Sequence, residues 1–585
     1  MQLNPWALAS VALVMVATSY LGRRTSQSAR ETDDFLVARR MVRSRRNASA
    51  ISGEYLCVAS FLGVAGMVLK DGADALWYPI GFTVGFLALC IFVAAPLRRS
   101  GAYTIPDFVE ARLGSAGLRR LSTGFVAILA LIYLVPQLQG VGLALSAIMP
   151  EPWVLWAVVI VVVLAAANVV TGGLRSATLV QAFQHWIKLF ALAIPAFVLC
   201  SVFLGSGGMG SAGGLGDEAP PEFTEETTVT VGVDTVLRVE EPTLVHELDA
   251  EPPGPRMWVP GIDYSVREGD RLLFPASSSV PTVRDTEGDN ASWLRPSGDA
   301  DEVWWTYSVL VATFFGTMGL PHVLARFYTN PDGRAARRTT VQVLLLLGLF
   351  YLFPVLLGVL SRLYVPELLV TGASDAAVLL VPTAMLPGVV GQLVVAVLAA
   401  GVFAAFVSTS SGLLVSAAGM VATDLMWNKR RDFVVAVVVI SGAALGIAVA
   451  LPFDDLIHTV GLAFALAAST FCPLLLLGIW WRRLTWVGAV VGMLVGGAGV
   501  LTAVGFHIAS RVNGESVPWF VSQPALLTVP VALLTTVIAS LATARRIPED
   551  VDVVMLQLHA PDRLGFMRDP SGAGTTHVSG RPRRP

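Results

Sequence analysis

Long apolar runs, separated by short polar segments, set the pattern of this chain. About thirteen of them are close to 20 residues or longer, the length of helix that crosses a hydrocarbon layer ~30 Å thick. They cover roughly residues 5–22, 47–69, 76–96, 119–149, 153–171, 179–205, 304–326, 339–363, 384–425, 432–452, 456–480, 485–508 and 523–543. The pattern predicts an all-α, polytopic membrane protein. The run at 384–425 is too long for one straight crossing, so we expect one span and a short outer helix there.

The composition supports this class of protein. Hydrophobic residues make up 54% of the 585 residues and charged residues only 14%, whereas a soluble domain carries charge on about a quarter of its residues. The cysteines all fall within or beside apolar runs, at Cys57, Cys90, Cys200 and Cys472. Their positions indicate neither a disulfide framework nor the spacing of a metal site.

Basic residues cluster after the odd-numbered runs, as in RRTSQSARETDDFLVARRMVRSRR after the first and RFYTNPDGRAARR after the seventh. Because cytoplasmic loops carry an excess of Lys and Arg, we expect the N-terminus outside a cell membrane and the C-terminus in the cytoplasm. The first run has no basic residues ahead of it, so we interpret it as a retained helix and not as a signal peptide.

A long polar segment, residues 206–303, falls on the predicted outer side. It begins with the flexible sequence GSGGMGSAGGLG and continues with β-prone stretches such as TTVTVGVDTVLRV. These stretches predict a small extracellular β-rich module, and a poorly ordered loop is the alternative. Beyond about residue 545 the chain is polar and rich in Pro and Arg, which predicts a disordered cytoplasmic tail.

Two of the apolar runs are interrupted by small or helix-breaking residues. The interruptions in the second and seventh runs are Gly53, Gly63, Gly66, Gly316, Gly319 and Pro321. The two runs open successive blocks of five, and because five is odd the second block enters the membrane in the opposite orientation. Interrupted spans at matching positions of inverted repeats point to the site of a secondary transporter. Close helix packing through small residues is the alternative.

This arrangement divides the chain into five parts. They are residues 1–205 (the N-terminal helix and first repeat), 206–303 (the insert), 304–480 (the second repeat), 481–544 (two C-terminal spans) and 545–585 (the tail).

Several polar side chains lie deep within apolar runs. Glu54 could compensate a cation or carry a proton, unless it pairs with an arginine near the cytoplasmic face. Lys188 shares a helix face with Gln181 and Gln184. It could bind a substrate carboxylate, replace a cation or carry a proton, unless it extends to a membrane interface.

Four consecutive hydroxyls, Ser408 to Ser411, lie in the apolar segment FVSTSS. Successive helix residues point about 100° apart, so at most two neighbours face one cavity. Two hydroxyls and the carbonyls freed from an unwound helix would suit Na⁺ as hard oxygen ligands. A hydrogen bond to the carbonyl one turn earlier is the alternative for each of them.

Several motifs occur together and in a characteristic order: GEYLCVASFLG, RRSGAYTIPDFVEARLG, VPQLQGVG, GTMGLPHVLARFYTNPDGRAARR and GLAFALAAST. Together they resemble the sodium:solute symporter family, and most closely its cation/acetate symporters, over about residues 5–205 and 304–543. The resemblance implies a LeuT/APC-type fold, which is a five-plus-five inverted repeat with an extra N-terminal helix and two C-terminal helices. It also implies transport by alternating access.

The resemblance implies a set of site residues as well. The cation site consists of Ser52, Tyr55, Ala405, Ser408 and Thr409, with Na⁺ at the two adjacent hydroxyls Ser408 and Thr409. The ion path includes Thr178, Lys188 and Glu54, which stands where the family usually has Asp. The interrupted spans and nearby polar positions give the candidate substrate contacts Gly63, Gly66, Gln137, Gly316, Gly319 and His322.

We therefore expect a secondary active transporter that imports a small solute with Na⁺. The resemblance implies a short-chain monocarboxylate such as acetate. Proton coupling through Glu54 or Lys188 is one alternative, and a transporter-like nutrient sensor acting with a separate partner is another. We expect no enzyme activity, because the sequence offers no nucleophile–base pair, His/Cys cluster or phosphate loop. The expected partners are a small solute, Na⁺ or H⁺ and the lipid bilayer, with no cofactor beyond the coupling ion and no nucleic acid.

Overall fold

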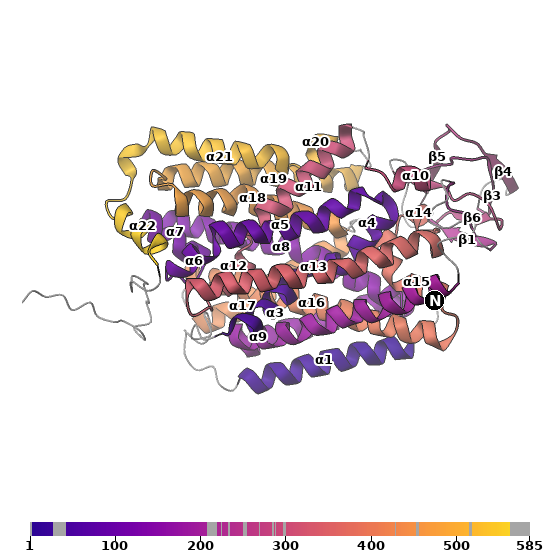
Figure 1. The fold of residues 1–585 in the computed structure, drawn as a ribbon, viewed down its shortest axis with the longest axis horizontal. Helices are drawn as coiled ribbons and strands as arrows, with labels where there is room; N and C mark the ends of the chain where they lie inside the picture. Colours follow the sequence, from indigo (N-terminus) through magenta and orange to yellow (C-terminus); the bar gives the residue numbers. More distant parts are fainter. Residues whose placement is uncertain are drawn as a thin grey trace, which may run out of the picture.

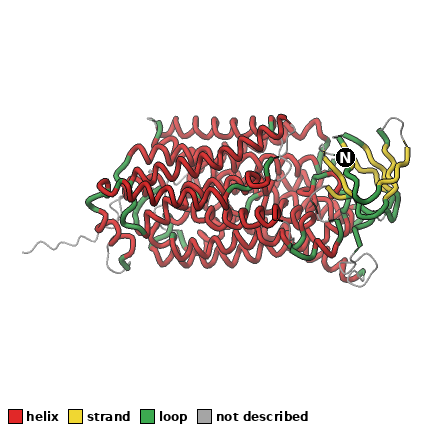
Figure 2. The backbone as a smooth tube through the Cα atoms, turned by 90° about the horizontal axis from the view of Figure 1, so that it is seen from above, coloured by secondary structure: helices red, strands yellow, loops and turns green. Residues whose placement is uncertain are grey.

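The computed structural model describes residues 3–26, 42–206, 219–296 with short internal gaps, 300–426, 429–451, 456–513 and 517–561. In this part of the chain, 11 helices are long and apolar enough to cross a membrane, or 13 if each of two bent helix pairs counts as one span. The helices run side by side along one direction (Figures 1 and 2). The predicted polytopic helical fold is confirmed.

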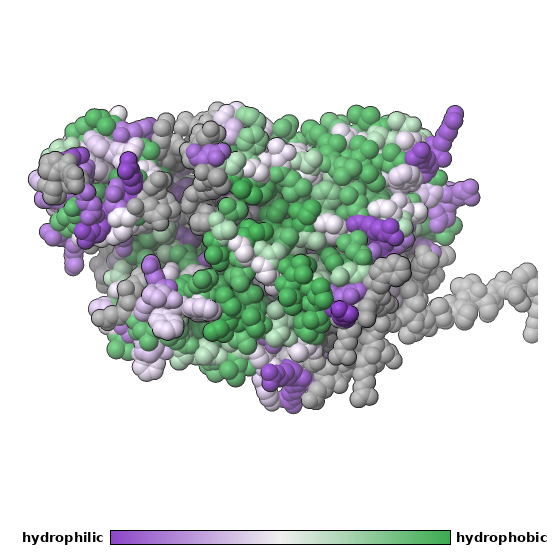
Figure 3. Space-filling model, turned by 180° about the vertical axis from the view of Figure 1, so that it is seen from behind, coloured by the Kyte–Doolittle hydropathy of each residue, from purple (hydrophilic) through white to green (hydrophobic). Residues whose placement is uncertain are grey.

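The straight spans are carried by ten helices. They are α1 (Pro5–Ser26), α5 (Trp77–Phe92), α8 (Ala116–Ser146), α9 (Glu151–Gly205), α13 (Gly333–Tyr364), α16 (Val389–Asp424), α17 (Lys429–Ala450), α18 (Leu456–Trp480), α19 (Trp486–Asn513) and α21 (Ala525–Ala542). Two of the candidate spans, Glu151–Thr171 and Ala177–Gly205, lie in α9. On the face shown in Figure 3, apolar side chains cover the middle and polar ones gather toward the two ends. A broad apolar band of this kind is what a bilayer would contact.

Both predicted spans are interrupted, but the first break falls between Tyr55 and Ala59 and not at Gly53, Gly63 or Gly66. The first lies between α3 (Ser44–Tyr55) and the segment formed by a π-helical turn (Ala59–Gly63) and α4 (Val64–Asp71), which bends by 77° from α3. The second separates α11 (Ala300–Gly319) from α12 (Pro321–Phe327), with a bend of 43°. Pro321 explains the second break, because a proline disfavours helical dihedrals in the residue before it. Leu320 accordingly has an extended ψ of 111°.

The broken helices open the two repeats. The first repeat contains α3 and α4, α5, α8 and the two spans of α9, and the second contains α11 and α12, α13, α16, α17 and α18. The helix α1 precedes the repeats, and α19 and α21 follow them. Across the repeats, α16 packs along α9 and α3, α11 packs along α5, and α13 packs along α3 and α4. The interruption in the first repeat therefore lies beside helices of the second.

The insert between α9 and α11 contains two antiparallel sheets, so the predicted β-rich module is confirmed. One sheet has the strand order β1-β6-β3-β4 and the other β5-β2-β7. The strands are β1 (Thr227–Thr230), β2 (Thr235–Arg238), β3 (Thr243–Glu247), β4 (Gly254–Trp258), β5 (Tyr264–Val266), β6 (Arg271–Phe274) and β7 (Thr282–Val283). Figure 1 shows the strands at the same end of the bundle as the N-terminus, and α6 (Ala94–Arg99), α7 (Ile105–Leu113) and α22 (Val551–His559) at the other. We call the first end outer and the second inner.

One tryptophan anchors the insert to the outer end of the first broken helix. Trp293 lies in the short helix α10 (Asn290–Trp293), and its indole N–H donates to the carbonyl of Val68 in α4 at 2.7 Å. The buried guanidinium of Arg362, in α13, lies 5.4 Å from the centre of the same ring. Gly72 has φ 53°, and a Cβ there would lie 1.9 Å from the Trp293 carbonyl, so the close approach requires glycine.

Two details differ from the sequence predictions. The run at 384–425 is a single 36-residue helix, α16, and the short outer helices precede it as α14 (Leu368–Thr371) and α15 (Ala377–Met385). The tail expected to be disordered from about residue 545 forms α22, whose Leu558 is buried and which packs against α6. The segment is ordered because α22 has apolar side chains, Met555 and Leu558, that are buried against the rest of the protein. The remainder of that tail, 562–585, lies outside the described residues. The last short helix, α20 (Trp519–Ser522), joins α19 to α21.

Candidate functional site

Backbone carbonyls at the end of α3 face two hydroxyls of α16. Ser408 donates from Oγ to the carbonyl of Gly53 at 2.6 Å, and Thr409 donates from Oγ1 to the carbonyl of Glu54 at 2.7 Å. Ser408 Oγ also lies 3.0 Å from the carbonyl of Ala405, one turn earlier in α16. The structure therefore brings three predicted cation ligands to the first interruption.

The ammonium of Lys188 lies among the same oxygens. Its Nζ donates to the carbonyl of Gly53, to the carbonyl of Leu56 at 2.5 Å and to Ser408 Oγ at 2.9 Å. Lys188 is fully buried. Because an ammonium has three N–H donors, these contacts account for all of them. The side-chain nitrogen of Lys188 thus lies between α3 and α16, among the oxygens that the sequence predicts as cation ligands.

Gln181 supports this arrangement from the same face of α9. Its side-chain amide donates from Nε2 to the carbonyl of Ser408 at 2.9 Å. One turn further along α9, Gln184 donates from Nε2 to Thr18 Oγ1 of α1 at 3.1 Å. The side chains of Gln181, Gln184 and Lys188, which the sequence places on one face of α9, are therefore buried against α1, α3 and α16.

A second charged contact lies directly beside the first. Glu54 Oε2 accepts from Arg326 Nε at 2.6 Å, and neither side chain is exposed. Arg326 also donates from Nη1 to Thr178 Oγ1 at 2.8 Å, and its carbonyl accepts from Asn47 at 3.0 Å. The pair connects α3 with α12, which are the inner segments of the two broken helices. Glu54 and Thr178, both predicted for the ion path, thus meet at Arg326.

Sequence reasoning missed Arg326 and Gly412. Arg326 ends the seventh apolar run, and its charge was grouped with the basic loop RFYTNPDGRAARR that set the orientation. Gly412 lies one turn after Ser408 on α16, and a Cβ there would lie 1.9 Å from Glu54 Oε1. Its position four residues after Ser408 was the available signal, because residues i and i+4 share a helix face.

Gln137 contacts the first interruption, and His322 lies directly after the second. Gln137 Oε1 accepts from the backbone N–H of Val58 at 3.0 Å, within the unwound segment of the first broken helix. Both side chains are buried, and among the described residues neither Gln137 Nε2 nor either ring nitrogen of His322 has a hydrogen-bond partner. The Tyr133 ring lies 5.5 Å from the His322 ring and 5.9 Å from that of Phe464. Each of these two buried side chains therefore carries polar atoms that no described hydrogen bond uses.

Two predicted cation ligands on α3 have other contacts. Tyr55 shares a hydrogen bond of 2.7 Å with Thr317 through its hydroxyl, and its ring packs edge-on against Phe86 at 4.7 Å. The carbonyl of Ser52 accepts from the backbone N–H of Leu56 at 3.0 Å and so continues the helix. The carbonyls that face α16 belong instead to Gly53 and Glu54, which adjoin these two positions.

The four predicted substrate-contact glycines lie at close helix contacts. A Cβ on Gly63 would lie 2.6 Å from Ile457, and one on Gly66 would lie 2.8 Å from the Ser374 carbonyl. On α11, the corresponding distances are 2.6 Å from Gly316 to the Phe464 carbonyl and 2.5 Å from Gly319 to the Ala467 carbonyl. These glycines allow the broken helices to pack against neighbouring backbone, as in other helix interfaces built on small residues.

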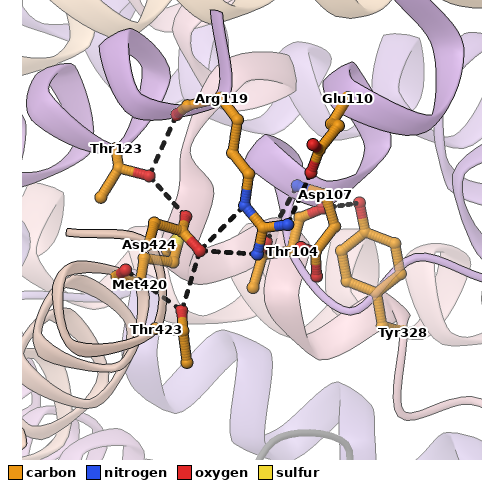
Figure 4. A network of polar contacts seen from close by, with 9 residues as sticks. All are labelled: Thr104, Asp107, Glu110, Arg119, Thr123, Tyr328, Met420, Thr423 and Asp424. Carbon is orange, nitrogen blue, oxygen red and sulfur yellow. Dashed lines mark hydrogen bonds and ion pairs between the residues drawn. The ribbon is translucent and has the colours of Figure 1, made fainter. Parts of the chain in front are cut away.

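A polar network ties three helices together at the inner end (Figure 4). Arg119, near the start of α8, contacts Asp107 at 2.7 Å and Glu110 at 2.6 Å in α7, and Asp424 at 2.6 Å at the end of α16. Thr123 donates to the other oxygen of Asp424 at 2.6 Å. Because the Asp424 side chain is only 1% exposed, these hydrogen bonds are needed to compensate its burial.

The fold and the site define a class of protein. Two helices are interrupted at matching positions of inverted repeats, and carbonyls freed at one interruption face hydroxyls and a charged side chain, which is the architecture of a secondary transporter. The chain belongs to the sodium:solute symporter family, whose model matches residues 35–239 and 279–496.

Two relatives match nearly the whole chain. A protein of Corynebacterium glutamicum named "Monocarboxylic acid transporter" is 27% identical over 587 aligned residues, covering 96% of this chain and 95% of the relative. The "Uncharacterized symporter YwcA" of Bacillus subtilis is 26% identical, covering 93% and 95%. The structure of a Na⁺-coupled sialic acid symporter in a substrate-bound outward-open state matches with a TM-score of 0.60 and 15% identity, covering 92% of this chain and 97% of that one. This last likeness concerns the fold.

Proposed function

We propose that this protein is a cation-coupled symporter that imports a small monocarboxylate such as acetate. The family and the Corynebacterium relative support symport and this substrate class. The observation that carries the coupling proposal is the pairing of Ser408 and Thr409 with the carbonyls of Gly53 and Glu54 across the first interruption. An ion that binds oxygens of both α3 and α16 stabilises the conformation in which these two helices lie close together. Coupling requires such a preference of the ion for one conformation.

The substrate carboxylate is proposed to bind between the interruptions. Gln137 Nε2 and the ring nitrogens of His322 are buried polar atoms without described partners, and a carboxylate accepts hydrogen bonds from such N–H groups. The neighbouring rings of Tyr133 and Phe464 would contact a short alkyl group. A small acid fits this combination better than a sugar, which would require many more polar contacts.

Na⁺ and H⁺ are both candidate coupling ions, each favoured by a different observation. Family membership and the oxygen ligands favour Na⁺. The position of Lys188 favours H⁺, because its ammonium already contacts Gly53, Leu56 and Ser408. Na⁺ could enter among these oxygens only if Lys188 withdrew or lost its proton, since two positive charges in a buried site repel each other strongly. Loss and return of that proton would itself couple transport to a proton gradient.

Uptake of radiolabelled acetate into proteoliposomes tests the proposal. One series applies an inward Na⁺ gradient at constant pH, and the other applies an inward proton gradient with K⁺ in place of Na⁺. Concentrative uptake driven by either gradient supports the symport proposal, and the effective gradient identifies the ion. Absence of acetate, propionate and pyruvate uptake under both gradients, with amino acids and sugars transported instead, would overturn the monocarboxylate assignment.

A further inference from the structure

Two histidines face each other at the outer end of the bundle. His458 lies near the start of α18, and His507 lies near the end of α19. Their Nε2 atoms are 3.2 Å apart, and the ring centres are separated by 4.6 Å. His507 Nε2 also lies 3.1 Å from the carbonyl of Ser522 in α20. Both rings are half-buried.

The separation of the two nitrogens matches a metal site. Zinc binds imidazole nitrogen at about 2.0–2.1 Å with tetrahedral angles, which places two such nitrogens about 3.3 Å apart. Each neutral imidazole carries only one N–H. Without a metal, an N–H on His507 Nε2 would donate to the Ser522 carbonyl or to His458 Nε2. A metal ion between the rings would accept a lone pair from each Nε2, with the proton of each ring on Nδ1.

The backbone around the pair is held in place by other contacts. The His458 carbonyl accepts from Gln523 Nε2 at 3.3 Å, and the N–H of Leu456 donates to Asp375 at 3.0 Å. Gln523 is buried, and Gly461 leaves room for its amide, because a Cβ there would lie 2.7 Å from Gln523 Nε2. The backbone that carries the His458 ring is therefore held in place, which lowers the entropy lost when a ligand binds.

We propose that His458 and His507 bind one transition-metal ion, with Zn²⁺ as the best-matched probe, and that the bound ion slows transport by joining α18 to α19. The Ser522 carbonyl, which lies 3.1 Å from His507 Nε2, would supply a further ligand, and water would complete the coordination. Imidazole ligands select Zn²⁺, Ni²⁺ or Cu²⁺ over Mg²⁺ and Ca²⁺, which prefer oxygen.

The effect on transport follows from the neighbours of α18. The carbonyls of Phe464 and Ala467 lie against Gly316 and Gly319 of the second broken helix, at the contacts described above. A metal that fixes the outer end of α18 to α19 would restrain the helix on which that broken helix rests. This part of the inference rests on the proposed transport function, whereas the binding of the metal does not.

Calorimetric titration of the full-length protein in detergent with ZnCl₂ tests the binding. We expect saturable binding of one ion, with affinity reduced at least about tenfold in His458→Ala and in His507→Ala. His246→Ala and His559→Ala are matched controls, because these histidines lie in the β module and in α22. Unchanged affinity in the His458→Ala/His507→Ala double variant, or no saturable binding by the wild type, would overturn the site.

Thermal unfolding separates loss of the site from loss of the fold. Without metal, both single variants should unfold near the wild-type temperature, and ZnCl₂ should raise the unfolding temperature of the wild type and controls only. MgCl₂ should raise none of them. A rise of equal size in His507→Ala would count against the pair as the ligands.

Solute uptake by proteoliposomes tests the consequence. External ZnCl₂ should slow uptake by the wild type, EDTA should restore it, and His507→Ala should be insensitive. If Zn²⁺ binds at the pair and uptake is unchanged, the proposed restraint of α18 is wrong while the metal site stands. If the wild type transports nothing, the transport proposal fails, and the calorimetric result still decides the site.

Discussion

Glu54 and Arg326 form an ion pair of 2.6 Å in which neither side chain is exposed. Removing one member of a buried pair leaves an uncompensated charge and costs about 3–5 kcal/mol. We therefore expect Arg326→Gln to lower the free energy of unfolding by roughly this amount, measured by denaturant unfolding in detergent. The Glu54→Gln/Arg326→Gln double variant should be more stable than Arg326→Gln alone. Equal destabilisation of both variants would show that the pair is not coupled.

Gly412 sets the space available to the Glu54 carboxylate. A Cβ at this position would lie 1.9 Å from Glu54 Oε1, so Gly412→Ala must displace the carboxylate or separate α16 from α3. We expect loss of most solute uptake in proteoliposomes. The matched control is Gly442→Ala in α17, where no atom lies within 4 Å of the added Cβ. Equal activity of the two variants would contradict this role for Gly412.

Ser408 and Thr409 are distinguished from their neighbour Ser411 by their contacts. The first two reach carbonyls of α3, whereas Ser411 donates to the carbonyl of Val407 in its own helix at 2.5 Å. We expect Ser408→Ala and Thr409→Ala each to reduce ion-driven uptake by about tenfold or more, since each removes an oxygen at a buried charged site. Ser411→Ala should retain near-normal uptake. A similar loss in all three variants would indicate a general packing effect.

Lys188 lies among the oxygens between α3 and α16 that we propose as ligands of the coupling ion. Lys188→Ala removes the ammonium, so NaCl should raise the unfolding temperature of this variant more than that of the wild type, with choline chloride as the ionic-strength control. Lys188→Arg keeps a positive charge and should show no such gain. Identical responses to Na⁺ in Lys188→Ala and the wild type would contradict occupation of the cation position by this ammonium.

The network around Arg119 gives a pH-dependent prediction. Burial raises the pKa of Asp107 above its ordinary value near 3.8, against the opposing effect of Arg119, while Asp424 raises it further. A carboxyl whose pKa is higher in the folded state contributes stability at low pH and loses it as pH rises through that pKa. Asp107→Asn should therefore gain stability relative to the wild type as pH rises from about 4 to 7. The measurement is the unfolding temperature against pH.

The matched variant for this prediction is Asp424→Asn. This substitution removes the negative charge that pairs with Arg119, whose Nε and Nη2 both donate to the Asp424 carboxylate. We expect it to destabilise the protein at neutral pH. A parallel pH dependence of Asp107→Asn and the wild type would show that Asp107 does not titrate differently in the folded protein.

The spans and interruptions could be predicted from the sequence because their signals are local. Apolar runs of sufficient length mark the helices, and Pro321 alone accounts for the break at Leu320. The first break is different, because no proline or glycine lies at residues 56–58. It occurs where carbonyls of Gly53, Glu54 and Leu56 bond to side chains of α9 and α16. Such contacts join segments more than 100 residues apart in the chain, and a local pattern cannot show them.

The site was predictable only in part for the same reason. Lys188 and Ser408 stood out separately as polar residues in apolar runs, but their distance from each other depends on how α9 packs along α16. Arg326 was assigned to a loop because its charge follows the end of an apolar run. Its burial depends on Glu54, which lies 272 positions earlier in the chain.

The Trp293 ring carries contacts from both repeats at once. Its N–H bonds to Val68 in α4, and its face receives Arg362 from α13. If α4 swings away from α13, the ring must leave one of these partners, which costs on the order of 1–3 kcal/mol. That amount changes the ratio of two conformations by about five- to 150-fold. The β-rich insert, through Trp293, is therefore linked to the relative position of α4 and α13, and with it to the equilibrium between conformations that move these two helices apart or together.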